Sequence, residues 1–360
     1  MAAGPRGYYS TRVKVRNLAE TRRFPSTVQK RAVLDRMHSR HIRYGDRVRT
    51  IKFIGVSTAG SSIHQVFPRW ARLLGVDAEV VGVDVPRGPD AHARLRDALS
   101  AIRADERCLG AVVTSWKSAL YQVTATDFDE LDELAAECHE VNAVRRHEDG
   151  RLSGYARDPI SVGRVVDGIW PERDADLLCL GSGGTAIALG RHLLARGQRG
   201  RLQFIDREPA QTSHFTEVMR TVMRTVMGSV AGEGALNVDG TVCIEAKAVD
   251  GPYDDLVAGA RPGTLIVNAT GAGKDRAGSP VTDNVEFPRE SVFWDLNYRG
   301  ELGMLAAARR QADDQDLRVH DGLSLFCHGW AAALSAVLGL PDDPGLADAF
   351  AAELPRAGSR

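Results

Sequence analysis

A single lysine follows an apolar run in the stretch GAVVTSWKS, which spans residues 110–118. The small and β-branched residues before Thr114 are typical of a buried strand in a parallel sheet. Open α/β sheets bind their ligands at the carboxyl ends of such strands. Lys117 therefore stands where a side chain can exchange a proton with a substrate. The alternative is an ordinary surface lysine in a loop.

A glycine-rich turn follows a second apolar run. The stretch CLGSGGTAIALG places Gly181, Gly183 and Gly184 between a predicted strand and a predicted helix. Glycines at such a turn let the backbone approach a diphosphate, whose charge the amino end of the helix stabilises. The next predicted strand ends at Asp206, where a carboxylate can accept hydrogen bonds from ribose hydroxyls. The pattern predicts dinucleotide binding, and the alternative is a purely structural turn.

The choice between NAD and NADP depends on two adjacent residues. The carboxylate of Asp206 would repel the 2′-phosphate of NADP, which favours NAD. Arg207 follows directly, and an arginine near this position can accommodate that phosphate. We expect NAD to be the cofactor, with NADP as the alternative.

Two successive α/β alternations must position these residues. Segments 51–56, 78–85 and 108–114 are predicted strands, separated by helices over 63–75 and 89–105 and followed by a helix over 127–144. From residue 176 a second alternation places strands at 201–206, 240–246, 263–270 and 291–296 and helices at 185–197, 215–230, 303–312 and 324–340. This order predicts an α/β protein with mostly parallel sheets.

The composition is that of an ordinary globular protein. The 360 residues are enough for about two domains, and the net charge of -1 gives no reason to expect a nucleic acid or membrane partner. The five cysteines are scattered without a CxxC pair, which indicates a reducing cytosol and argues against disulfides or a metal site. Since no long apolar span or apolar signal core occurs, we expect a cytoplasmic protein.

The charge is concentrated at the amino terminus. Residues 1–50 hold thirteen Lys or Arg and three acidic residues, an excess of +10. We interpret residues 1–49 as a basic extension, partly helical across Ser26–Arg40. It is either a solvated arm, a segment that packs on a sister subunit in a homodimer, or a contact for an acidic partner. Nucleic acid is the least favoured of these.

The order of the segments resembles the shikimate/quinate dehydrogenase family over roughly residues 51–340. The stretches that carry the resemblance are FIGVSTAGSSIHQVF, AVVTSWK, HEVNAV, EDGRLSGYARD, LGSGGTA, VNATGAG, WDLNYRG and VHDGLSLFCHGWAAAL. The resemblance implies a substrate-binding α/β domain at 50–157, completed by a helix within 318–345. It also implies a Rossmann-type NAD(P)-binding domain at 158–317, with the active site in the cleft between the two.

The resemblance implies a catalytic pair, Lys117 and Asp158. A lysine can protonate the developing alkoxide if burial or nearby charge lowers its pKa toward the working pH. Asp158 would orient the ammonium and bind a substrate hydroxyl; the alternative is a loop acid before Pro159. The implied substrate-binding residues are Thr58, Ser61, Asn142, Tyr298 and His328. The implied cofactor-binding residues are Gly181, Gly183, Gly184, Thr185, Asp206, Arg207, Asn268, Thr270 and Gly322.

Several positions depart from the family pattern. Gly60 and Val113 stand where the family has hydroxyl side chains, and His328 where it has a glutamine. Trp116 directly precedes the lysine, and Arg157-Asp158-Pro159 stands where the family has Thr-Asp-Gly. Because the catalytic pair is retained while polyol contacts change, the sequence indicates an altered substrate.

These observations together predict an NAD(P)-dependent alcohol dehydrogenase or ketone reductase. Its substrate would be a small polar alicyclic or carboxylate-bearing compound, of the kind used in specialised metabolism. The alternatives are a shikimate or quinate dehydrogenase proper, an imine reductase, or a non-catalytic dinucleotide-binding sensor or scaffold. Retention of both Lys117 and Asp158 counts against the last, because a binding module has no use for the pair.

Overall fold

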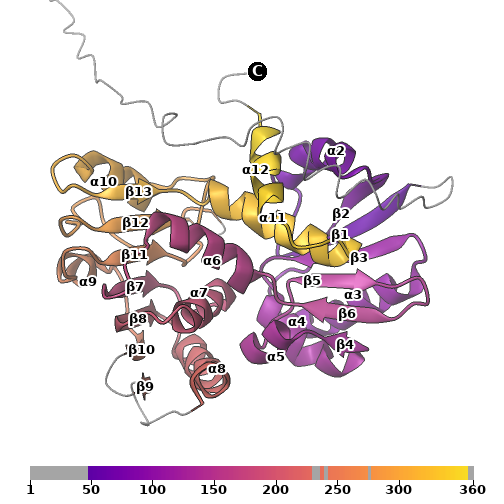
Figure 1. Cartoon of the computed structure of the whole chain (residues 1–360), viewed down its shortest axis with the longest axis horizontal. Coiled ribbons are helices and arrows are strands. Elements are labelled where there is room, and N and C mark those ends of the chain that lie inside the picture. Colours follow the sequence, from indigo (N-terminus) through magenta and orange to yellow (C-terminus); the bar gives the residue numbers. More distant parts are fainter. Residues whose placement is uncertain (1–47, 229–235, 239–241, 275–276, 356–360) are drawn as a thin grey trace, which may run out of the picture.

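The computed structural model describes residues 48–228, 236–238, 242–274 and 277–355. The helix expected across Ser26–Arg40 lies outside the described residues. Within them the chain forms two sheets side by side, one built from each predicted alternation (Figure 1). The predicted class, α/β with two domains and mostly parallel sheets, is confirmed.

The first sheet has the strand order β2-β1-β3-β5-β6-β4. Strands β1, β2 and β3 are parallel, while β5 is antiparallel to both β3 and β6. All six residues of β3 are buried, as expected of a central strand. The strands are β1 (Arg49–Gly55), β2 (Ala78–Asp84), β3 (Cys108–Val113), β4 (Glu130–Leu131), β5 (Ala143–Arg146) and β6 (Leu152–Tyr155).

The helices of this half form because their apolar residues recur at helical spacing. In α2 the buried residues include Ile63, Phe67, Trp70 and Leu74, and the helix ends at Gly75 in the left-handed conformation. The helices are α2 (Ile63–Leu74), α3 (Ala91–Ala104), α4 (Lys117–Thr124) and α5 (Glu133–Cys138), with a short 3₁₀ turn at Ala125–Asp127.

The second sheet has the strand order β13-β12-β11-β7-β8-β10-β9, parallel except for the β9–β10 pair. Its strands are β7 (Leu177–Leu180), β8 (Gly200–Asp206), β9 (Leu236–Val238), β10 (Val242–Ala248), β11 (Leu265–Asn268), β12 (Val292–Asp295) and β13 (Arg318–His320). Its helices are α6 (Asp158–Ile169), α7 (Gly184–Ala195), α8 (Pro209–Met227), α9 (Asp254–Ala258) and α10 (Gly303–Gln311).

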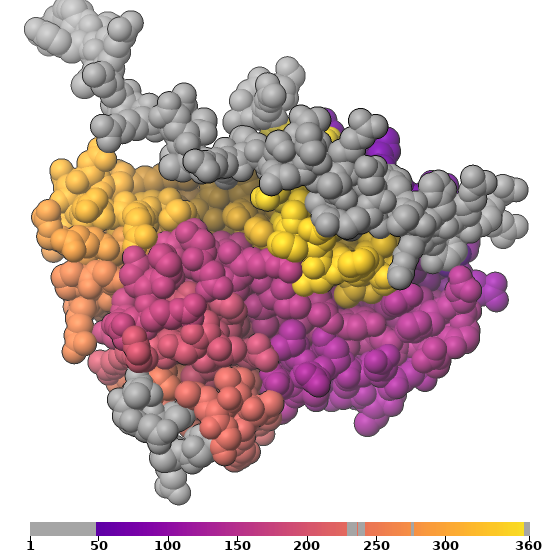
Figure 2. All heavy atoms as spheres, in the orientation of Figure 1, coloured from indigo at the N-terminus to yellow at the C-terminus, as the bar shows by residue number. Residues whose placement is uncertain are grey.

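The chain returns to the first half after β13. Helix α11 (Leu323–Leu338) packs on β3, β5 and α6, and α12 (Gly345–Ala352) packs on α11. Trp330, Leu334 and Phe350 share a core with Trp70 of α2. Figure 2 shows these carboxyl-terminal helices, in yellow, lying against both halves of the molecule. The strand β13, at the start of segment 318–345, belongs to the second sheet.

One predicted element is wrong. The helix expected over 127–144 is divided into the 3₁₀ turn, β4, α5 and the start of β5. The carboxylate of Asp132 accepts a hydrogen bond from the backbone N–H of Ala135 at 2.8 Å and so caps α5 at its amino end. His139 takes the left-handed conformation, with φ of 50°, and ends the helix. Every helix among the described residues is too short or too polar to span a membrane.

Candidate active site

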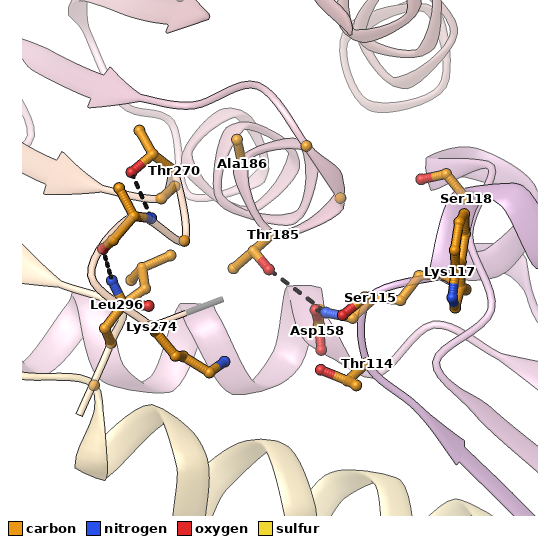
Figure 3. Close-up of a pocket in the computed structure, with 18 of the residues that line it drawn as sticks. Thr114, Ser115, Lys117, Ser118, Asp158, Thr185, Ala186, Thr270, Lys274 and Leu296 are labelled. Atoms are coloured by element: carbon orange, nitrogen blue, oxygen red, sulfur yellow. Dashed lines mark hydrogen bonds and ion pairs between the residues drawn. The ribbon is translucent and has the colours of Figure 1, made fainter. Parts of the chain in front are cut away.

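A cleft of about 1360 Å³ runs between the two sheets. Its walls come from the loops after the carboxyl ends of strands in both sheets, as the rule for open α/β sheets predicts. Residues 114–118 follow β3, residues 183–186 follow β7, and residues 207–208 follow β8. Figure 3 shows the middle of this cleft, where Lys117, Asp158 and Thr185 meet from α4, α6 and α7.

Lys117 and Asp158 form an ion pair in the cleft wall. Lys117 is the first residue of α4 and Asp158 the first of α6. The lysine ammonium also lies 3.5 Å from the hydroxyl oxygen of Thr185. The side-chain amide of Asn142 donates to the other oxygen of Asp158 at 2.5 Å, and its carbonyl accepts from the backbone N–H of Arg157 at 2.7 Å. The aspartate is thus fixed from two sides.

The electrostatics of Lys117 differ from the sequence-based expectation of a lowered pKa. Burial alone would lower the pKa, but the negative charges of Asp158 and Glu140 and the hydrogen bond to Asp158 raise it above its ordinary value. The lysine is therefore an ammonium ion at neutral pH, which is the form that gives a proton.

Glu140 is a second carboxylate near the pair that the sequence reasoning missed. Its side chain is fully buried, and burial, together with the charge of Asp158, raises its pKa to about 8. The only signal in the sequence was an acidic residue two positions before Asn142, in HEVNAV. Its significance depends on neighbours that are distant in the chain.

The three glycines of the turn have three different surroundings. Gly181 has φ of 110°, and a Cβ there would lie 2.8 Å from the backbone carbonyl of Ala269. At Gly183 no described atom lies within 4 Å of a Cβ position, so the backbone faces open space in the cleft. At Gly184 a Cβ would lie 2.5 Å from a carboxyl oxygen of Glu140.

Asp206 and Arg207 both line the cleft at the end of β8. One carboxyl oxygen of Asp206 accepts hydrogen bonds from the backbone N–H and the hydroxyl of Ser182, at 3.0 and 3.2 Å. The aspartate therefore holds the glycine turn while facing the cleft. The guanidinium of Arg207 lies 3.6 Å from the carboxylate of Glu208, and its side chain is 55% exposed.

Thr185, Thr270 and Gly322 line the cleft, whereas Asn268 does not. Asn268 is buried below the loop after β11, where its side-chain carbonyl accepts from the hydroxyl of Thr270 at 2.7 Å. Asn268 thus shapes the loop that carries Thr270 and does not reach the cleft itself. Figure 3 shows Thr270 and Lys274 on the side opposite Lys117.

Ser61 and Tyr298 line the cleft on the substrate side, together with Arg299. Burial raises the pKa of Tyr298, and the nearby Ser62 and Arg299 side chains oppose this only in part. A Cβ at Gly60 would lie 3.7 Å from the Arg299 guanidinium, so the missing side chain leaves room beside this cation. The buried Nε of Arg299 has no hydrogen-bond partner among the described residues. The sequence reasoning missed Arg299, although it directly follows Tyr298.

Two expected substrate contacts lie away from the cleft. The hydroxyl of Thr58 donates to Asp84 at 2.6 Å, and Thr58 is not among the cleft-lining residues. His328 also lies off the lining face of α11, which presents Phe326, Gly329 and Trp330. Successive residues of a helix point about 100° apart around its axis. Gly329 therefore lies on the face of α11 that lines the cleft, where His328 had been expected.

The cleft fits a nicotinamide dinucleotide. The amino end of α7 opens into it, no side chain caps that end, and the backbone at Gly183 is accessible. Such a helix terminus stabilises a diphosphate. Among the described residues, no three His, Cys, Asp or Glu side chains are grouped so as to hold a metal ion.

Known proteins resemble this chain in sequence and in fold. It is 28% identical over 266 residues to the shikimate dehydrogenase (NADP(+)) of Salinibacter ruber, an alignment that covers 71% of this chain and 81% of the relative. The quinate dehydrogenase of Corynebacterium glutamicum, solved in complex with NAD, superposes with a TM-score of 0.61 at 20% identity and covers 86% of this chain and 100% of its own.

A third similarity is to a reductase of a different kind. The 5-ketofructose reductase of a Gluconobacter species has a TM-score of 0.57 at 18% identity, covering 85% of this chain and 98% of its own. No protein-family model matches the chain. Together, these comparisons show that the chain resembles shikimate dehydrogenases in sequence and shares the fold of shikimate and quinate dehydrogenases.

Proposed function

We propose that the protein is an NAD(P)-dependent oxidoreductase that interconverts an alcohol and a ketone on a small polar alicyclic or carboxylate-bearing compound. The observation that carries this proposal is the Lys117–Asp158 ion pair in the wall of a cleft that also contains the amino end of α7. The pair is a proton donor held by a carboxylate, and it lines the same cleft as the glycine turn.

The proposed chemistry uses the lysine as the acid. When bound, the reduced nicotinamide supplies a hydride to the carbonyl carbon of the substrate. The carbonyl oxygen then takes a proton from the ammonium of Lys117, which leaves a neutral amine. Asp158, tied by Asn142, holds the ammonium in position during this transfer. In the reverse direction the neutral amine accepts the hydroxyl proton.

Lys117 is protonated at neutral pH in the free protein, and this is the form that ketone reduction requires. The pKa of Lys117 is raised despite burial, chiefly by the charge of Asp158, so the proton is already in place at neutral pH. Oxidation of the alcohol requires the amine form, and it should therefore accelerate as the pH rises.

The position of Arg299 favours a substrate that carries an anionic group. Its guanidinium lies beside Gly60 and Tyr298, on the cleft wall that also carries Ser61. Guanidinium groups bind carboxylates with two parallel hydrogen bonds. The combination of a small residue at 60 and a cation above it favours a carboxylate at this end of the substrate.

Asp206 supports NAD as the preferred cofactor. Its carboxylate lines the cleft at the end of β8, where it would accept hydrogen bonds from the ribose hydroxyls and repel a 2′-phosphate. Residues 50–157 with the segment 318–345 would hold the substrate and residues 158–317 the dinucleotide, with Asp158 and Arg299 reaching the substrate across the cleft.

The proposal is tested by incubating the protein with NAD or NADP and a panel of alicyclic hydroxy acids that includes shikimate and quinate. Formation of the reduced cofactor is followed by its absorbance, and the reverse reaction is run with the corresponding ketones. We expect turnover with at least one member and a preference for NAD. Cofactor binding without turnover on any member would favour a dinucleotide sensor instead.

A further inference from the structure

Glu140 has no use in the chemistry described so far. It lies in the connection between α5 and β5, and its side chain is fully buried. Neither carboxyl oxygen has a hydrogen-bond partner among the described residues. Buried carboxyl groups without partners are costly, so they are rarely kept by a structure without a role.

The carboxyl group lies against the start of the phosphate-binding helix. A Cβ at Gly184, the first residue of α7, would come within 2.5 Å of a carboxyl oxygen of Glu140 and 3.7 Å of the hydroxyl of Ser118. Gly184 therefore admits the Glu140 side chain, while Gly183 next to it faces the cleft. Glu140 thus lies directly behind the turn where a diphosphate would bind.

The charged groups around Glu140 are few. Lys117 of α4 and Asp158 of α6 act on it directly. On α5 the thiol of Cys138 has its pKa raised by burial and by Glu140, so it stays uncharged. Farther along, Glu137 is paired with Arg191 of α7 at 2.9 Å.

The two carboxyl groups near the Lys117 ammonium are therefore not equivalent. Asp158 has the ion pair with Lys117 and the hydrogen bond from Asn142, whereas Glu140 has neither. Burial and the charge of Asp158 raise the pKa of Glu140 to about 8, and the charge of Lys117 opposes this only in part. Glu140 is therefore mostly protonated at neutral pH, and its charge appears at mildly alkaline pH.

We propose that the carboxyl group of Glu140 must carry a proton for a dinucleotide to bind at the amino end of α7. Cofactor binding then takes up a proton whenever Glu140 is ionised in the free protein. This inference rests on the proposed function, because it needs the diphosphate at that turn. The diphosphate brings two negative charges to a helix end that Glu140 already approaches from behind. In a buried setting such like charges repel strongly, and the protein avoids the repulsion by keeping Glu140 neutral.

The direction of the pH effect follows from linkage. Below about pH 8 Glu140 is already protonated, and cofactor affinity is constant. Above it, binding must also draw a proton from solvent, so affinity falls as the pH rises. The pKa values of Lys117 and Tyr298 are raised above their ordinary values, so neither group titrates in this window.

The test is to measure NADH binding by fluorescence titration between pH 7 and 9.5, with no substrate present. For the wild type we expect the dissociation constant to rise about 10- to 30-fold over this range, as expected for one proton and a free-protein pKa near 8. In the isosteric variant Glu140→Gln it should change by less than about threefold. The variant should therefore bind NADH more tightly than the wild type at pH 9.5, which no purely structural damage would produce.

A second measurement does not depend on the variant folding. Calorimetry of NADH binding to the wild type at pH 8, in two buffers of different ionisation enthalpy, should show net proton uptake. Glu133→Gln is the matched control, since Glu133 is an exposed carboxylate on α5, and this variant should keep the wild-type pH dependence.

The outcomes separate the two proposals. Absence of NADH and NADPH binding at any pH would overturn the proposed function. Binding with no proton uptake, or with the same pH dependence in the Glu140→Gln variant and the wild type, would overturn the inference alone.

Discussion

The ammonium of Lys117 and the carboxylate of Asp158 form an ion pair although the two residues are 41 positions apart in the chain. Each begins a helix, so both side chains project from helix starts into the same cleft. Asn142, which lies directly before β5, donates a side-chain hydrogen bond to the aspartate. Three separate turns of the chain must fold correctly for the proton donor to be in place.

The first prediction concerns the lysine. Lys117→Ala should lower kcat by about 10²–10⁴-fold, the usual contribution of a positioned acid or base. The dissociation constant for NADH should change much less than kcat, because the contacts proposed for the diphosphate and the ribose come from the backbone at the start of α7 and from Asp206. Lys117→Arg should not restore the rate, since guanidinium hardly releases its proton near neutral pH. Steady-state kinetics and NADH titration measure the two quantities.

The aspartate supplies the control for that prediction. Asp158→Asn should also lower kcat, and the double variant should lose less than the product of the two single losses, because the residues act as one unit. If the losses multiply in full, the two side chains act independently and the role given to Asp158 is incorrect.

The second prediction separates two neighbouring glycines. Gly183→Val should weaken NADH binding at least about tenfold without lowering the melting temperature, because its φ of -76° suits any residue and its Cβ position is open to the cleft. Gly181→Ala should instead destabilise the fold by about 1–3 kcal/mol, since it forces a side chain onto a left-handed backbone and against Ala269. Thermal unfolding and fluorescence titration distinguish the two effects. Unchanged NADH affinity in a folded Gly183→Val protein would place the diphosphate elsewhere.

The third prediction concerns the choice of cofactor. Asp206→Ala should weaken NAD binding more than NADP binding, because it removes an acceptor for the ribose hydroxyls and a charge that repels the 2′-phosphate. The aspartate also holds Ser182, so part of any loss is structural. The variant Ser182→Ala removes only the hydroxyl bond and serves as the control. Equal losses for both cofactors after Asp206→Ala would contradict the assignment.

The fold class and the glycine turn could be predicted because they depend on local patterns. Alternating apolar runs and helical spacing mark the strands and helices from β1 to α3, and the glycines of residues 181–184 lie directly between β7 and α7. The division of segment 127–144 could not be predicted in this way. Its acidic and apolar residues recur at helical spacing, but Asp132 caps a helix that His139 ends seven residues later.

Side-chain directions were harder to predict than positions. Thr58 lies in the expected loop, yet Asp84 draws its hydroxyl away from the cleft. His328 lies on the expected helix, but one residue out of phase with the face that lines the cleft. Glu140 lies against Gly184, and Arg299 lies beside Gly60. In each pair the glycine is distant in the sequence and leaves room for the charged side chain. Such contacts exist only in the folded chain.

The last prediction tests the end of the cleft where Arg299 lies beside Gly60. If the guanidinium binds a substrate carboxylate, Arg299→Gln should raise KM for a carboxylate substrate about 10- to 100-fold, the loss of a hydrogen bond to a charged group. The effect on kcat should be much smaller, because Arg299 is not part of the Lys117–Asp158 pair. The methyl ester of the same substrate carries no charge, so its KM should respond little to the substitution. Arg299→Lys should recover part of the affinity through charge alone, without the two parallel bonds. A structural role for Arg299 would instead raise KM for acid and ester alike, since damage to the cleft wall does not depend on the charge of the ligand.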